Sequence, residues 1–172
     1  DILVNNAGIA GVSKPLWECS CDEWREVIEL DLIAVFHVCK SLIPSMMARK
    51  RGKIINIASD AGRVGSSGEA VYSACKGGII AFTKTLSREI SRKGININTV
   101  CPGPSDTPLF AQFAGSGESG EKLRASLARA IPLKRLGTAD DISGMVAFLA
   151  SDDADFVVGQ TISVSGGLTM HG

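Results

Sequence analysis

The stretch KIINIASDAGRVGSSGEAVYSACKGGIIAFTKTLSREISRKGININTVCPG, residues 53–103, decides the fold because it holds two strand-like segments around one long helical segment. Residues 53–59 and 95–100 are β-branched, apolar runs of strand length. Between them, residues 69–92 are typical of a helix that ends at Gly94. Two nearly all-apolar strands joined by a helix predict a parallel sheet covered on both faces.

The same alternation precedes this stretch. An apolar run at residues 2–4 breaks at Asn5, as a buried strand does when it ends in a loop. Apolar residues then recur at helical spacing from residue 22, and we expect Pro44 to kink or restart that helix before residue 49.

The alternation also follows it. The prolines of CPGPSDTP predict that the second strand stops at residue 100. We expect helices at residues 118–130 and 139–149, the latter capped by Thr138, and a last strand in QTISVSGG. The whole chain, residues 1–172, is therefore predicted to form a single α/β domain of the doubly wound, Rossmann type.

Composition excludes several classes of function. With 172 residues, 45% of them hydrophobic, the chain can bury one core, and its 18 basic and 18 acidic residues predict no nucleic-acid or anionic-membrane partner. No apolar run reaches the roughly 20 residues that span a bilayer, so we expect a cytoplasmic protein without a membrane segment. Five cysteines and two histidines, His37 and His171, show no metal-ligand spacing, so we expect reduced thiols and no metal site.

Three unusual loops follow the predicted strands. They are NNAG (residues 5–8), ASDAG (58–62) and CPGPSDT (101–107). Taken singly, such loops mark turns more often than binding sites. Because ligands of doubly wound sheets bind outside the carboxyl ends of the strands, the three loops together indicate one site.

Tyr72 and Lys76 begin the long helix after the second loop. Residues four apart project from the same helix face, although a packed ring beside a solvated ammonium is the commoner meaning of this spacing. A phenol has a pKa of about 10, and a nearby cation is expected to lower it, which suits proton transfer to or from an alcohol or carbonyl oxygen. Ser59, at the end of its strand, could hydrogen-bond the same oxygen.

These motifs, in this order, resemble the short-chain dehydrogenase/reductase family over essentially the whole chain. The matching features are NNAG, a Ser thirteen residues before the Tyr, Tyr-x-x-x-Lys, and Pro-Gly followed by Thr. The resemblance implies that Tyr72 is the catalytic acid/base, that Ser59 orients and polarises the substrate oxygen, and that Lys76 lowers the pKa of Tyr72 and holds the nicotinamide ribose.

The resemblance also implies a cofactor and a substrate class. The cofactor is NAD, with NADP not excluded, and the reaction is hydride transfer with a secondary alcohol or ketone. Several stretches are similar to dehydrogenases of alicyclic hydroxyacyl-CoA compounds such as 2-hydroxycyclohexanecarboxyl-CoA, while reduction of a 3-oxoacyl thioester remains the alternative. The implied cofactor-binding residues are Asn6, Ala7, Gly8, Tyr72, Lys76, Pro102, Gly103, Ser105 and Thr107. A lid over the substrate at about residues 108–130 and a homo-oligomer, dimer or tetramer, are further expectations.

Two departures from the family pattern affect function. Asp31 stands where the family has an Asn that anchors a water in a proton relay, and an ionised carboxylate donates no hydrogen bond but would pair with Lys76 if close. The family also begins with a strand and a Gly-rich turn that binds the pyrophosphate, and we expect this first βαβαβ half to be missing here. The strand at Ile2 would then be an exposed edge, and an inactive fragment that acts only as a binding or assembly module remains a further alternative.

Overall fold

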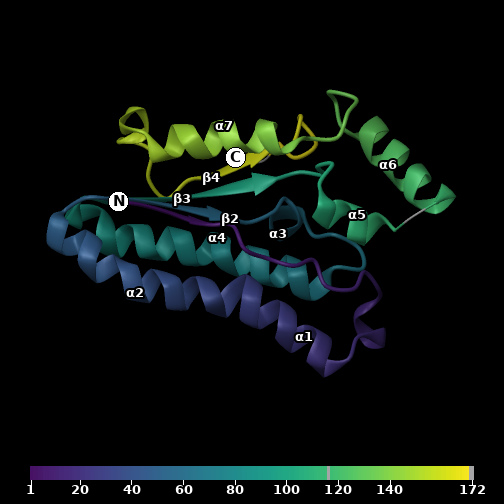
Figure 1. The fold of residues 1–172 in the computed structure, drawn as a ribbon, viewed down its shortest axis with the longest axis horizontal. Helices are drawn as coiled ribbons and strands as arrows, with labels where there is room; N and C mark the ends of the chain where they lie inside the picture. Colours follow the sequence, from purple (N-terminus) through teal and green to yellow (C-terminus); the bar gives the residue numbers. More distant parts are fainter. Residues whose placement is uncertain (116, 171–172) are drawn as a thin grey trace.

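A four-stranded parallel sheet organises the computed structural model, which describes residues 1–115 and 117–170. Its strands are β1 (Ile2–Asn5), β2 (Gly52–Ile57), β3 (Ile95–Pro102) and β4 (Thr161–Val164), in that spatial order. Leu3 pairs with Ile54, and Ile54 pairs with Ile97. The predicted parallel α/β architecture is confirmed (Figure 1).

Helices cover both faces of the sheet, as predicted (Figure 1). On one face lie α1 (Cys21–Ile28), α2 (Ala34–Arg49) and α4 (Ala70–Ile90), and on the other lies α7 (Ala139–Ala150). Each face has its own apolar core. One core includes Cys39, Ile54 and Ile79, and the other includes Val100 and Leu149.

The helix predicted over residues 22–49 is interrupted before Pro44 and not at it. A π-helical turn, η2 (Glu29–Ile33), joins α1 to α2, whereas α2 continues through Pro44 to Arg49. Widened turns of this kind occur often at functional sites. This one carries Asp31, which the structure buries almost completely.

Strand β3 runs two residues beyond its predicted end. Proline lacks a backbone donor, but the carbonyl of Pro102 still accepts a hydrogen bond from the amide of Asp60 at 3.1 Å, and Pro102 pairs with Val164 of β4. The prediction that the prolines stop the strand at residue 100 is therefore wrong.

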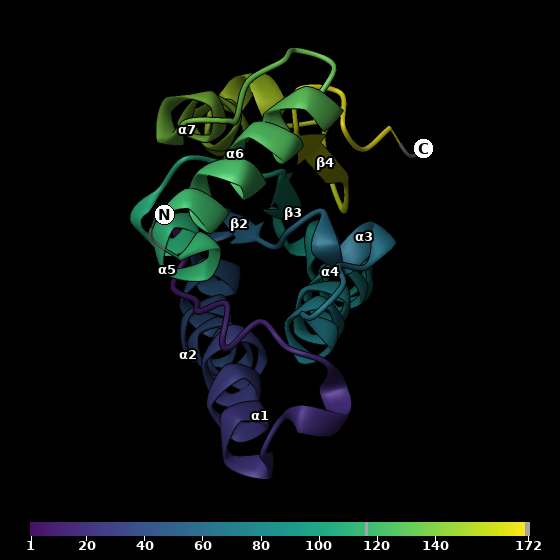
Figure 2. The same cartoon turned by 90° about the vertical axis from the view of Figure 1, so that its right-hand side faces the viewer.

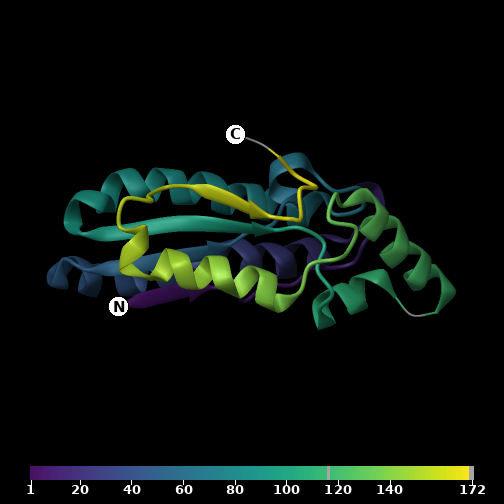
Figure 3. The ribbon, with the colours of Figure 1, turned by 90° about the horizontal axis from the view of Figure 1, so that it is seen from above.

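The remaining elements lie around the carboxyl end of the sheet or in its connections. The loop after β2 contains a short helix, α3 (Ala61–Val64), where we expected irregular chain. Beyond β3 come α5 (Pro108–Ala114) and α6 (Glu118–Ala130), which project past the strand ends in Figures 2 and 3. Short 3-10 turns complete the chain: η1 (Leu16–Glu18), η3 (Ser91–Lys93) and η4 (Asp152–Ala154). The predicted lid spans these helices, but its residue 116 lies outside the described residues, as does His171.

Strand β1 forms one edge of the sheet, as expected. Its apolar residues Ile2 and Val4 are 55% and 42% exposed. Within residues 1–115 and 117–170, no helix combines the length and the apolar character that crossing a membrane requires.

Candidate active site

The carboxyl ends of the strands bring Ser59, Tyr72 and Lys76 together, as predicted. Ser59 follows β2, and the other two side chains project from the first turns of α4. Ser59 makes a side-chain hydrogen bond with Tyr72. Its Oγ also accepts a hydrogen bond from the amide of Ala61 at 3.1 Å, which holds the serine at the start of α3.

The side chain of Lys76 is buried beside the strand ends. Its Nζ donates to the carbonyl oxygen of Ile57 at 3.3 Å and lies 5.4 Å from the centre of the Tyr72 ring. The side chain is only 7% exposed. The alternative meaning of the Tyr72–Lys76 spacing, a packed ring beside a solvated ammonium, is therefore excluded. The amino group of Lys76 faces the strand ends and not solvent.

Asp31 supplies the countercharge. Its Oδ2 lies 3.2 Å from Nζ of Lys76, and its Oδ1 accepts a hydrogen bond from the amide of Ile9 at 2.8 Å. The expected pairing with Lys76 is therefore confirmed. Removing one partner of a buried ion pair leaves a charge unpaired, so this pair fixes Lys76 and the loop after β1 together.

The phenol of Tyr72 is strongly shifted toward its protonated form. Burial raises its pKa to about 12, the hydrogen bond from Ser59 acts against this rise, and the negative charge of Asp31 adds to it. The net shift is therefore upward, and the expected lowering of this pKa by Lys76 remains a prediction.

A row of hydrogen-bonded side chains, which the sequence analysis did not predict, holds the end of β1 in place. Nδ2 of Asn5 donates to Oδ1 of Asn56 at 2.7 Å, and Nδ2 of Asn56 donates to Oγ1 of Thr83 on α4 at 2.8 Å. Asn56 and Thr83 are fully buried. These two hydrogen bonds connect β1, β2 and α4. They do so where the loop of Asn6, Ala7 and Gly8 begins.

Gly8 lies against the Asp31–Lys76 pair. A Cβ atom at this position would lie 3.2 Å from Asp31 Oδ1 and 3.2 Å from Lys76 Nζ. Such contacts are tight, so a side chain here would push on the ion pair. Asn6 and Ala7, by contrast, are exposed.

The loop after β3 uses its hydroxyl groups to hold its own conformation. Oγ of Ser105 donates to the carbonyl of Gly103 at 3.0 Å, and Oγ1 of Thr107 accepts from the amide of Phe110 at 3.2 Å, which caps α5. Ser105 also pairs with Gly137 in an isolated bridge. The roles of Pro102, Gly103, Ser105 and Thr107 toward a cofactor remain predictions.

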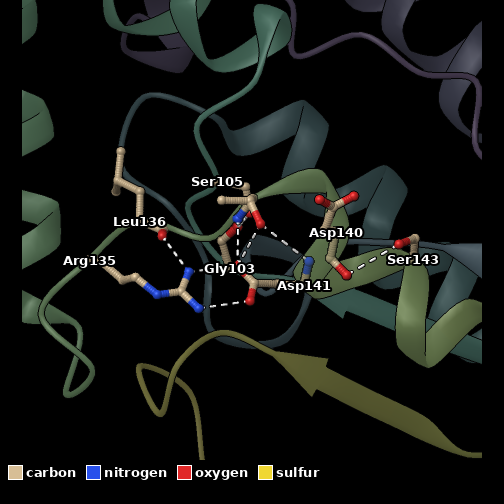
Figure 4. Close-up of polar contacts among 8 residues, drawn as sticks. Gly103, Ser105, Arg135, Leu136, Asp140, Asp141 and Ser143 are labelled. Carbon is tan, nitrogen blue, oxygen red and sulfur yellow. Dashed lines mark hydrogen bonds and ion pairs between the residues drawn. The ribbon is translucent and has the colours of Figure 1, made fainter.

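Gly137, the partner of Ser105 in this bridge, comes just before α7, where side-chain hydrogen bonds hold the start of the helix (Figure 4). Arg135 binds both carboxylate oxygens of Asp141, at 2.6 and 2.7 Å, and Asp141 forms a capping box with Thr138. Hydrogen bonds from Arg135 and Thr138 hold the pKa of Asp141 well below its usual range. Thr138 caps this helix, as predicted.

Sequence reasoning also missed Asp60, which follows Ser59. Its Oδ1 accepts a hydrogen bond from Oγ of Ser163 on β4. The same Oγ of Ser163 accepts a hydrogen bond from Nη1 of Arg63 at 2.7 Å. Asp60 is 5% exposed. An acidic residue at the end of a buried strand was the available signal, because such a carboxylate needs partners when it is buried.

Helix α6 of the predicted lid contacts the loop after β3 through Arg124. Arg124 of α6 forms an ion pair with Asp106 and stacks over the ring of Phe110, with its guanidinium carbon 5.0 Å from the ring centre. These contacts connect α6 to the loop and to α5. Whether the segment closes over a substrate remains a prediction.

The donor set around Lys76 suits a ribose diol. An ammonium has three donors, and the described partners of Nζ are Asp31 and the carbonyl of Ile57. A third donor can therefore bind a sugar hydroxyl beside Tyr72. A small cavity of about 30 Å³ adjoins Tyr72, between the loop after β1 and the start of α4.

Several known proteins are similar to this chain over nearly its whole length. The family model described as enoyl-(acyl carrier protein) reductase matches residues 1–169. The 3-oxoacyl-[acyl-carrier-protein] reductases of Salmonella typhimurium and Escherichia coli are 41% and 40% identical to this chain over 170 residues, 99% of the chain and 67% of each relative. A structure of a 3-oxoacyl-[acyl-carrier protein] reductase with bound NAD from Brucella melitensis matches with a TM-score of 0.89 and 35% identity, over 99% of this chain and 63% of that one. The chain thus spans about two thirds of the length of these proteins.

Proposed function

The chain belongs to the short-chain dehydrogenase/reductase family of oxidoreductases, and from this premise we propose that it carries the catalytic residues of a nicotinamide-dependent reductase of 3-oxoacyl thioesters. The names of the similar reductases support this substrate class above an alicyclic hydroxyacyl-CoA. We propose NAD as the cofactor, with NADP as the alternative.

The observation that carries the proposal is the grouping of Tyr72 with its hydrogen-bond partner Ser59 and with the buried Lys76, one turn further along α4. Reduction of a ketone leaves an alkoxide oxygen that must receive a proton, and a group whose pKa is about 12 holds that proton at neutral pH. Oxidation of an alcohol would first require Tyr72 to lose it. The resting site is therefore in the protonation state that ketone reduction needs.

Ser59 and Lys76 complete the arrangement. When bound, the nicotinamide supplies the hydride. The hydroxyl of Ser59, which contacts Tyr72, can donate a hydrogen bond to the substrate oxygen as negative charge develops there. Lys76 holds the ribose hydroxyls from the same helix face.

Asp31 has two effects in this scheme. It fixes Lys76 through their ion pair, and its charge helps to keep Tyr72 protonated. An ionised carboxylate has no proton to donate, so Asp31 does not replenish Tyr72 as a donor would. We propose that Asp31 slows proton transfer to the site without abolishing it.

Reduction of acetoacetyl-CoA, a small 3-oxoacyl thioester, tests the proposal in the purified protein with NADH and NADPH in turn. We expect turnover that Tyr72→Phe removes, while cofactor binding measured by fluorescence stays within about twofold, because the ring remains and only the acidic hydroxyl is lost. Ser45→Ala, which also removes a single hydroxyl but from an exposed position on α2, is the control and should leave turnover unchanged. Turnover that survives Tyr72→Phe would refute the role of Tyr72.

The same assay separates the alternatives. Oxidation of 2-hydroxycyclohexanecarboxyl-CoA without reduction of acetoacetyl-CoA would favour the alicyclic substrate. A protein that binds neither cofactor and turns over neither substrate would favour the binding or assembly module.

A further inference from the structure

The short helix α3 packs directly on the first half of α4 (Figures 1 and 2). A Cβ atom at Gly62 of α3 would lie 2.6 Å from the amide nitrogen of Gly77 and 2.6 Å from the carbonyl carbon of Lys76. Carbon atoms in favourable contact lie about 3.5–4.0 Å apart, so position 62 has no room for a side chain. The φ angle of Gly62 is not positive, and the need for glycine there is therefore steric and not conformational.

The contact is mutual, because the residue of α4 that faces Gly62 is also a glycine. A Cβ atom at Gly77 would lie 3.2 Å from the carbonyl oxygen of Gly62. Both sides of the contact are backbone, which cannot turn aside as a flexible side chain can. The two glycines therefore set the distance between α3 and the part of α4 that carries Tyr72 and Lys76.

Gly62 is coupled to Ser59 by the turn that begins α3. The amide of Gly62 donates to the carbonyl of Ser59 at 3.0 Å. Oγ of Ser59 accepts from the amide of Ala61 at 3.1 Å. A displacement of α3 is thus passed to the hydroxyl group that contacts Tyr72.

The turn is also fixed to the sheet on its other side. The amide of Ala58 donates to the carbonyl of Val100 at 2.8 Å, and the amide of Asp60 donates to the carbonyl of Pro102 at 3.1 Å. These bonds hold the backbone on both sides of Ser59 against β3. A side chain at position 62 must therefore push either the turn or α4 away, and both movements separate Ser59 from α4.

We propose that Gly62 is a positioning residue for the proposed reduction and holds the hydroxyl of Ser59 within hydrogen-bonding reach of Tyr72. This role rests on the proposed function, in which Ser59 donates to the substrate oxygen. Relief of the 2.6 Å contacts needs a separation of roughly 1 Å. A hydrogen bond between hydroxyl groups spans only about 2.5–3.0 Å, so that separation breaks it. Gly62→Ala should therefore act as the loss of the Ser59 hydroxyl does.

The carbon-13 resonance of Tyr72 tests this role in the purified chain without substrate. Tyr72 is the only tyrosine, so labelling of tyrosine at Cζ gives one resonance that reports hydrogen bonding to the phenol. We expect Gly62→Ala to move this resonance toward its position in Ser59→Ala. In the Ser59→Ala background, Gly62→Ala should cause a much smaller change, because the contact through which it acts is already lost.

Gly144→Ala is the matched control, because a Cβ atom at this position of α7 would meet no heavy atom within 4 Å. It should leave both the resonance and turnover unchanged. Gly77→Ala is a milder variant of the same contact. Alanine favours a helix over glycine, so this variant should fold even if Gly62→Ala does not, and circular dichroism checks both. We expect its resonance to move in the same direction by a smaller amount.

Turnover separates this role from the proposed function itself. In acetoacetyl-CoA reduction, Gly62→Ala should lower kcat at least tenfold while the KM for the cofactor stays within about twofold, because only the substrate oxygen loses a donor. An unchanged chain without turnover would refute the proposed function, and the Tyr72 resonance would still test the role of Gly62. A Tyr72 resonance that does not move in Gly62→Ala, or that moves equally with and without the Ser59 hydroxyl, would overturn that role.

Discussion

Direct titration of Tyr72 tests the electrostatics on which the proposed chemistry rests. Tyr72 is the only tyrosine of the chain, so ultraviolet absorbance of the phenolate reports this group alone. Burial raises its pKa from 10.0 to about 12. A shift of two units corresponds to about 3 kcal/mol of preference for the protonated form.

Two substitutions should move this pKa in opposite directions. Asp31→Asn removes a negative charge that raises the pKa of Tyr72 and leaves Lys76 without its countercharge, so the pKa should fall. Ser59→Ala removes the hydrogen bond that stabilises the phenolate, so the pKa should rise. The pair of variants distinguishes specific contacts from general burial.

The same shift affects stability at high pH. The unfolded chain releases the Tyr72 proton near pH 10, whereas the folded chain holds it to about pH 12. Between these values the unfolded state binds fewer protons, so this contribution is fully present below pH 10 and is lost as pH rises to 12. A phenolate that forms at or below pH 10 in the folded chain, or an Asp31→Asn variant in which its pKa rises, would refute the reasoning.

Three further predictions concern stability and the Arg135–Asp141 pair at the start of α7. Asn56→Ala should lower the free energy of unfolding in urea by about 1–3 kcal/mol, because it removes the Asn56 partner of both Thr83 and Asn5 and leaves Asn5 with only the thiol of Cys39. The exposed Ser45→Ala should change it by less than about 0.5 kcal/mol, and equal effects would contradict the role of the hydrogen bonds of Asn56. Hydrogen bonds from Lys14 and Ser20 lower the pKa of Glu23 from 4.5 to about 2, so its stabilising contribution is present above pH 4.5 and is lost as pH falls to 2; the thermal midpoints of the unchanged chain and Glu23→Gln should therefore differ at pH 7 and converge near pH 2, and a constant difference would show that charge is not the cause. Arg135→Gln should increase amide hydrogen exchange at the start of α7 and at Gly137 but not in β1, since Arg135 holds Asp141 in the capping box. Unchanged exchange at Gly137 would show that the Arg135–Asp141 pair does not stabilise this segment.

Most of the fold could be predicted because its signals are local. The helix at 118–130 and the Thr138 cap depend on patterns within a few residues, and both match the structure. The π turn at Glu29–Ile33 has no such pattern. It follows from tertiary contacts, since Asp31 must meet Lys76 and the amide of Ile9 at once.

The candidate site also has a part that could be predicted from the sequence and a part that could not. Ser59, Tyr72 and Lys76 could be predicted because a strand end and a four-residue helix spacing bring them together. The partners of Asp60 and Asn56 could not be predicted, because Ser163 and Thr83 lie 103 and 27 residues away in sequence. Periodicity carries no information about which buried polar groups find each other across the sheet.

The pKa of Tyr72 shows why a motif does not fix its own electrostatics. In isolation, a lysine four residues from a tyrosine favours the phenolate. Here burial is the largest cause of the shift, and the buried carboxylate of Asp31, which lies 3.2 Å from the ammonium, adds to the rise. An asparagine at position 31 would keep the neighbour of Lys76 polar but remove the countercharge, and the same Tyr-x-x-x-Lys motif would then favour ionisation. Burial is therefore the main reason that Tyr72 keeps its proton, and Asp31, a residue outside the motif, adds to this effect.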